Sequence, residues 1–191
     1  MKIGLISDTH GSLSAWEKGL KVLSKSDIIV HGGDILYHGP RNPLPDRYDP
    51  QALSEALNNF DRPLFLVKGN CDAAVDEMVL DLPLITPFFY ASIEGITILA
   101  LHGDGYTEAE MFKLGKDYGA QVVVFGHIHE PLIKQNANGI VLVNPGSSSL
   151  PKGERPRSTV AMIDLEAKKI EAFDLKTDEI IETMNLGGSI D

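Results

Sequence analysis

Two histidines that can bind a metal ion follow a predicted strand in the middle of the chain. The sequence Gly126-His127-Ile128-His129 comes directly after the apolar run 122–125, which predicts a buried strand that ends at the glycine. Side chains two residues apart point the same way in extended backbone, so we expect both imidazoles to face one point. Open α/β sheets bind ligands at the carboxyl ends of their strands. The pair therefore indicates a metal site.

Four other predicted strands end in donor side chains of similar type. The donors after these strands are Asp8 with His10, Asp34, Asn70 and His102. Oxygen and nitrogen donors of this kind bind divalent transition metals. A single histidine near a strand end is more often a hydrogen-bonded core residue, but five ordered blocks favour metal binding. Seven donors exceed one tetrahedral site and predict two metal ions that share a carboxylate, an arrangement suited to in-line phosphoryl displacement.

Composition restricts the class of protein. The chain has 191 residues, 43% of them hydrophobic, which is enough for one domain covering 1–191. It contains no apolar run long enough to span a membrane and no signal peptide, and Cys71 is its only cysteine, so we expect a cytoplasmic protein. The net charge of −10 argues against a general basic surface for nucleic acid.

Hydrophobic periodicity predicts an α/β first part. Buried strands are expected over residues 2–7, 27–31, 63–68, 96–101 and 121–126, and helices over 13–25, 50–60 and 108–118. Thr107 and Glu110 form a capping-box pattern before the last helix. Residues 35–50 contain four prolines and no period, so they predict a long loop of functional type. Residues 84–93 predict one edge strand, broken by Pro87.

The last third of the chain has the pattern of antiparallel strands. Residues 131–136 and 139–143 predict a hairpin, and short alternating strands are expected over 158–164, 169–176 and 180–185. No linker separates the two parts. We therefore predict one domain that contains two sheets.

The ordered blocks D-x-H, G-D, G-N-x-D, H-G and G-H-x-H, over residues 8–129, resemble the calcineurin-like metallophosphoesterase superfamily. The small size and the segments 38–42 and 144–147 resemble its YfcE-type phosphodiesterase subgroup more closely. This resemblance implies a four-layer α/β/β/α sandwich of two mixed sheets, with the trailing strands in the second sheet.

The resemblance also implies the roles of the donor residues. One metal ion would be held by Asp8, His10, Asp34 and His129, and the other by Asp34, Asn70, His102 and His127, with Asp34 bridging. Manganese is the implied metal, with iron, zinc, nickel or cobalt as alternatives. A metal-activated hydroxide would attack phosphorus, and Asp34, Asn70 and His102 are the catalytic candidates.

One block departs from the general pattern of the superfamily. Many members have histidine where this chain has Cys71, in Gly69-Asn70-Cys71-Asp72. A thiol with an ordinary pKa near 8.5 is uncharged at neutral pH and is a weaker acid than imidazolium. Cys71 and Arg41 are the candidate substrate-binding residues. The alternatives are a buried small residue for Cys71 and a solvated loop residue for Arg41. We interpret Asp72 as a residue that orients a ligand histidine, with the end of a turn as the alternative.

Two classes of function fit the sequence. The first is a metal-dependent phosphodiesterase acting on a small phosphodiester, with a nuclease or cyclic-nucleotide esterase as a variant of the same class. The second is a non-catalytic protein-binding module on the same fold, as in the related retromer subunit. The complete donor set favours the enzyme, and a homo-oligomer is left open.

Overall fold

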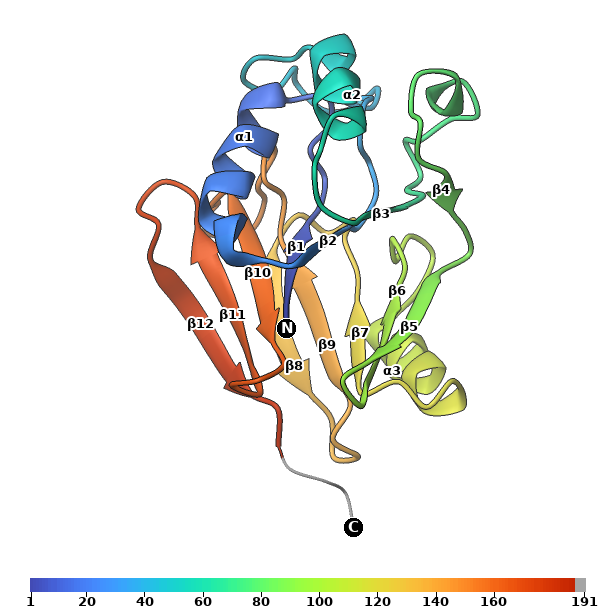
Figure 1. Cartoon of the computed structure of the whole chain (residues 1–191), viewed down its shortest axis with the longest axis vertical. Coiled ribbons are helices and arrows are strands. Elements are labelled where there is room, and N and C mark those ends of the chain that lie inside the picture. Colours follow the sequence, from blue (N-terminus) through green and yellow to red (C-terminus); the bar gives the residue numbers. More distant parts are fainter. Residues whose placement is uncertain (188–191) are drawn as a thin grey trace.

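The computed structural model describes residues 1–187, which form two mixed β-sheets with helices outside them (Figure 1). The first sheet has the order β12-β11-β10-β1-β2-β3-β4 and the second β5-β6-β7-β9-β8. The strands of the first sheet are β1 (Lys2–Ile6), β2 (Ile28–His31), β3 (Leu64–Val67), β4 (Leu84–Ile85), β10 (Thr159–Asp164), β11 (Lys169–Asp174) and β12 (Ile180–Asn185). Those of the second are β5 (Phe89–Ile93), β6 (Ile96–Ala100), β7 (Val122–Val124), β8 (Pro131–Gln135) and β9 (Val141–Pro145).

Three helices cover the outer faces of the sheets. Helices α1 (Leu13–Val22) and α2 (Pro50–Asn58) lie against the first sheet and α3 (Glu108–Asp117) against the second (Figure 1). Short 3-10 turns cover Leu23–Lys25 and Asp76–Met78. The capping box predicted before α3 is confirmed, because Thr107 and Glu110 exchange the two expected hydrogen bonds. The capping-box residues that the sequence indicates therefore begin helix α3.

Strand periodicity divides the apolar side chains among three cores. Val122 and Val124 of β7 face the core between the two sheets, whereas Val123 faces α3. In β1, Ile3 and Leu5 face the opposite sheet, and Ile6 of the same strand joins the core under α1 and α2. Successive side chains of a strand point to opposite faces, so strands buried on both faces are apolar throughout. The predicted four-layer α/β/β/α sandwich is confirmed.

Two strand assignments made from the sequence were wrong. Residues 84–93 are two edge strands in different sheets, because β4 pairs with β3 and β5 pairs with β6. The trailing strands do not all lie in the second sheet. Only β8 and β9 do, whereas β10 pairs antiparallel with β1 and extends the first sheet together with β11 and β12.

The topology gathers the donor-bearing loops at one end of both sheets. Strands β1, β2 and β3 run parallel in the first sheet, and β6, β7 and β9 run parallel in the second. Their carboxyl ends therefore lie at one end of each sheet. The long loop predicted over residues 35–50 lies between β2 and α2, and residues 35–49 contain neither helix nor regular strand, because Pro50 begins α2. Among residues 1–187, no helix has the length and apolar character needed to cross a membrane.

Candidate metal centre

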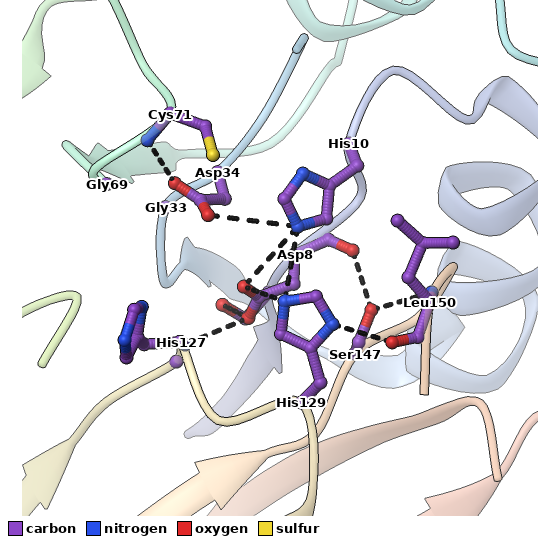
Figure 2. A network of polar contacts seen from close by, with 12 residues as sticks. Asp8, His10, Gly33, Asp34, Gly69, Cys71, His127, His129, Ser147 and Leu150 are labelled. Carbon is purple, nitrogen blue, oxygen red and sulfur yellow. Dashed lines mark hydrogen bonds and ion pairs between the residues drawn. The ribbon is translucent and has the colours of Figure 1, made fainter. Parts of the chain in front are cut away.

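Four donor residues from three loops converge in the interior (Figure 2). Asp8, His10, Asp34 and His129 each place one ligand atom within 4.8 Å of the others, and all four side chains are buried. Asp8 and His10 follow β1, Asp34 follows β2 and His129 follows β7. Carboxylate and imidazole donors at this spacing can surround one divalent cation.

Sharp backbone turns aim these side chains inward. The φ angles of five donor residues are positive: 54° at Asp8, 46° at His10, 57° at Asp34, 70° at His127 and 61° at His129. Such angles cost free energy in residues other than glycine and cluster at functional sites. Extended backbone over residues 127–129, assumed from the sequence, was therefore wrong. His129 joins the buried group around Asp8, whereas the half-buried His127 stands apart from it (Figure 2).

Three buried histidines of the centre, His10, His102 and His129, are each held by a backbone carbonyl. The ring atom Nδ1 lies 2.8 Å from the Tyr37 carbonyl oxygen in His10, 2.6 Å from that of Leu150 in His129 and 2.8 Å from that of Gly32 in His102. A carbonyl only accepts, so Nδ1 donates its proton and Nε2 is left with a free lone pair in the neutral ring. Metal-binding histidines are typically oriented by such a bond.

The donor atoms fit a cation better than they fit one another. The Nε2 atoms of His10 and His129 lie 3.2 Å apart with their lone pairs facing, and the Asp8 Oδ1 atom is buried without a hydrogen-bond partner among the described residues. Buried carboxylate oxygens are normally paired, because burial of an unpaired charge is costly. The other oxygen, Oδ2, already accepts bonds from the Ser7 hydroxyl and the His127 backbone N–H.

Asp34 connects this group to a second set of donors. Its Oδ2 atom lies 3.7 Å from His10 Nε2 and 3.4 Å from His102 Nε2. His102 Nε2 in turn lies 3.2 Å from Asn70 Oδ1, and the rings of His102 and His127 are 5.2 Å apart. The second set is more open to solvent, since Asn70 is exposed and His127 only half-buried.

The charges of the centre favour ionised carboxylates. Burial raises the pKa of Asp34, but the neighbouring His102 imidazole and the Cys71 N–H outweigh it and hold the pKa well below the usual range. Burial lowers the pKa of His102, but Asp34 and Asp8 outweigh it and raise the pKa to about 9. If His102 holds a metal ion, this proton would have to leave its ring, which would couple metal binding to pH.

A cleft of about 670 Å³ opens over both donor sets. Its walls include Asp34, His127 and His129, together with Asn70, Cys71, Arg41 and Lys152. The predicted residues Arg41 and Cys71 therefore lie beside the donors. Lys152 was missed, because a single lysine in a turn-rich loop forms no pattern. Its backbone N–H donates to the His129 carbonyl, which fixes the loop at the rim of the cleft.

Asp72 and Ser147 hold the loops that carry the donors. The Asp72 carboxylate accepts the backbone N–H groups of Gly69, Asp34 and Ile35. The interpretation that Asp72 orients a ligand histidine was therefore wrong, because it orients the backbone of two loops instead. The Ser147 hydroxyl donates to the Asp8 carbonyl at 2.8 Å, which ties the loop after β9 to the loop after β1.

His31 supports the same loops from beneath. Its Nδ1 accepts the Gly33 N–H, its Nε2 lies 3.0 Å from the Thr9 hydroxyl, and that hydroxyl donates to the Ile35 carbonyl. Thr9 therefore accepts from Nε2–H, and the ring is neutral with both nitrogens satisfied. Burial is the main cause that lowers the pKa of His31 from 6.5 to about 4.

We expect His31 to make the fold sensitive to acid. The unfolded chain binds a proton at this residue below pH 6.5, whereas the native protein does not until about pH 4, so stability is lost as pH falls through this window. At pH 5 the loss is ~2 kcal/mol. Urea unfolding of metal-free wild type and His31→Gln at pH 7 and pH 5 measures it. The free energy of unfolding of wild type should approach that of His31→Gln at pH 5. An equal difference in unfolding free energy at both pH values would contradict the lowered pKa assigned to His31.

Comparison with known proteins agrees with this geometry. Residues 1–168 match the model of the calcineurin-like phosphoesterase superfamily domain. The chain is 36% identical over 176 residues to phosphodiesterase YfcE of Escherichia coli K12, covering 91% of this chain and 93% of that protein. The solved structure of the E. coli YfcE phosphoesterase superposes with a TM-score of 0.84 at 33% identity, covering 98% and 100% of the two chains. Vacuolar protein sorting 29 from Cryptosporidium parvum shares the fold, with a TM-score of 0.69 at 17% identity over 96% and 95%. The chain therefore belongs to the calcineurin-like phosphoesterase superfamily.

Proposed function

We propose that this protein is a metal-dependent phosphodiesterase that hydrolyses a small phosphodiester. The observation that carries the proposal is the position of Asp34, whose carboxylate lies between a buried and a more open set of nitrogen and oxygen donors at the floor of one cleft. The similarity to E. coli phosphodiesterase YfcE over most of both chains supports the same activity.

We assign one cation to Asp8, His10, Asp34 and His129, and a second to Asp34, Asn70, His102 and His127, with manganese as the preferred metal. Two bound cations supply a nucleophile at neutral pH and stabilise charge that develops on the phosphate oxygens. The chain itself fixes the rings through their Nδ1–H bonds and holds Asp34 through the Cys71 N–H. Preorganised donors of this kind need no rearrangement during the reaction.

Arg41 and Lys152 are assigned to the binding of the substrate phosphate. Both line the cleft, although the whole chain has a net charge of −10. Local positive charge attracts a phosphate despite an acidic surface elsewhere. We assign Cys71 to the wall that faces the ester oxygens, because it lines the same cleft.

The proposals on domain organisation, location and oligomeric state rest on the sequence alone. We infer that residues 1–191 form one domain, of which 188–191 lie outside the described residues. A cytoplasmic location and a homo-oligomer stay predictions.

A non-catalytic binding module is the second candidate. The likeness to vacuolar protein sorting 29 favours it only at the level of fold, since the identity is 17%. A binding module does not need all seven donors, and all seven are present in this chain. The nuclease variant finds no support in the cleft, where the cationic side chains are Arg41 and Lys152 and no basic track leads away among its described lining residues.

Removal of metal tests the enzyme against the binding module. We expect chelation to reduce the hydrolysis of bis(p-nitrophenyl) phosphate by at least about 100-fold, because several kcal/mol of charge stabilisation depend on the cations. Manganese should restore activity, and elemental analysis should find close to two metal ions per chain. Circular dichroism checks that the stripped protein is folded. Full activity in a protein proven free of metal would contradict the mechanism, and inactivity with every metal and ester would favour the binding module.

A further inference from the structure

A second cavity, of about 640 Å³, adjoins the cleft over the metal centre. Tyr37 borders both spaces. The same two segments wall both, because residues 34–50 and 70–79 contribute Asp34, Arg41 and Cys71 to the cleft and Tyr48 and Val75 to the cavity. The two spaces therefore adjoin at Tyr37.

Tyr37 places this cavity directly beside a candidate ligand. Its main-chain carbonyl accepts the Nδ1–H of His10 at 2.8 Å, while the residue as a whole is 41% exposed. Because Tyr37 lines the cleft as well as the cavity, one ester group of a substrate whose phosphate lies over the donors can extend toward the cavity.

The walls of the cavity suit a flat or apolar group. Val75 and Val79 are 61% and 52% exposed at its edge. The lining rings of Tyr37 and Tyr48 pack on His38, which is not itself part of the wall, at centroid distances of 4.8 Å and 5.1 Å. Aromatic side chains that remain exposed beside a cavity favour offset or edge contacts with another ring. A volume of this size lies within the range of about 300–1,000 Å³ typical of small-molecule sites.

The two spaces differ in charge. The cleft over the donors is bordered by the cationic residues Arg41 and Lys152. The second cavity is lined by the acidic residues Glu55 and Asp76, and its described lining includes no cationic residue. An anion is therefore favoured over the donors and disfavoured in the second cavity. The group that enters must be neutral or cationic.

We propose that this cavity binds the ester group that stays on phosphorus when the diester is cleaved. The preferred substrates are thus phosphodiesters that carry one bulky aromatic or apolar group without further negative charge. The inference rests on the proposed phosphodiesterase activity and adds the substrate class.

Three diesters with the same leaving group test the substrate class. Methyl, phenyl and 4-carboxyphenyl p-nitrophenyl phosphate all release p-nitrophenolate and differ in the group retained. In the manganese-loaded wild type we expect kcat/KM for the phenyl ester to exceed that for the methyl ester about tenfold, equivalent to ~1.4 kcal/mol. The carboxyphenyl ester should fall below the phenyl ester, and Glu55→Gln should raise it relative to the phenyl ester.

Two variants locate the effect in the cavity. Gln51→Trp adds bulk to the wall formed by α2, and Tyr37→Ala removes the shared ring; both should bring the phenyl-to-methyl ratio close to one. Tyr118→Ala is the matched control, since Tyr118 is 45% exposed and lines neither space, and its ratio should equal that of wild type. An unchanged ratio in both cavity variants, with diester hydrolysis intact, overturns the proposal.

A binding experiment separates this proposal from the catalytic one. Diphenyl phosphate and dimethyl phosphate are titrated into the protein while backbone amide shifts of residues 51–58 and 75–79 are recorded. Shifts with diphenyl phosphate but not with dimethyl phosphate support binding in the cavity. They do so even when no diester is hydrolysed, because the absence of hydrolysis would refute only the proposed activity. Equal shifts with both esters, or no shifts with either, would overturn the proposal that the cavity binds the retained ester group. Self-association that Val75→Asp abolishes without a change in the kinetic ratio would assign the cavity to a second copy of the chain instead.

Discussion

Replacement of Asp34 with asparagine is expected to reduce kcat/KM for a diester about a thousandfold, even at saturating metal. The amide oxygen can keep the Cys71 N–H bond, which leaves the amide nitrogen at the place of Oδ2, 3.4 Å from His102 Nε2 and 3.7 Å from His10 Nε2. A donor then replaces the shared negative charge between both sets. Loss of several kcal/mol of charge stabilisation, at ~1.4 kcal/mol per factor of ten, gives this magnitude.

Asp8→Asn should reduce kcat/KM about tenfold less than Asp34→Asn does, because it perturbs only one of the two donor sets. The amide oxygen can replace Oδ2 as the acceptor of the Ser7 hydroxyl and the His127 N–H, while the amide nitrogen faces the set that contains His129. The measurement is kcat/KM of both variants over a metal titration, with elemental analysis of each. The exposed Asp117→Asn serves as the control and should behave as wild type. Equal losses in Asp34→Asn and Asp8→Asn would argue against a shared carboxylate.

The residue pattern was sufficient for the buried strands and for the donors at their ends, whereas the four layers were implied by the resemblance to the superfamily. Runs such as Val122–Val124 are apolar at every position, which predicts strands covered on both faces, and the donor residues directly after them mark one end of the sheets. The parallel pairing of β1 with β2 follows from the helix between them. The convergence of Asp8, His10, Asp34 and His129 could thus be predicted, because it depends on topology and not on fine geometry.

Features that depend on long-range contacts could not be predicted. Local pattern cannot distinguish one broken edge strand from β4 and β5 in two sheets, nor place β10 beside β1, since each pairing partner is remote in sequence. The divergence of His127 from His129 follows from their positive φ angles, which β-propensity does not encode. The role of Asp72 depends on backbone N–H groups that any residue type provides.

The second large expected effect concerns Cys71 and the choice between phosphomonoesters and phosphodiesters. Its thiol lines the cleft and faces the loop after β2, where a Cβ atom added to Gly39 would lie 3.2 Å from the sulfur. Burial is the main cause that raises the pKa of this thiol to about 12, with Asp34 acting in the same direction. The thiol therefore stays neutral and is a poor proton donor. An alkyl monoester needs a proton on its leaving oxygen, whereas nitrophenolate leaves unaided.

We expect Cys71→His to raise monoesterase activity relative to diesterase activity by about 100-fold, the lower end of what general acid catalysis provides. Imidazolium can protonate the leaving oxygen and adds positive charge against a dianionic monoester. The measurement is the ratio of kcat/KM for an alkyl monoester to that for bis(p-nitrophenyl) phosphate, with metal content confirmed. Cys71→Gln is the control, because it adds similar bulk without an acid and should leave the ratio low. If the ratio rises equally in both variants, bulk and not proton donation is the cause. If it rises in neither, the loop carrying Arg41 selects the ester class, because that loop forms the facing wall of the same cleft.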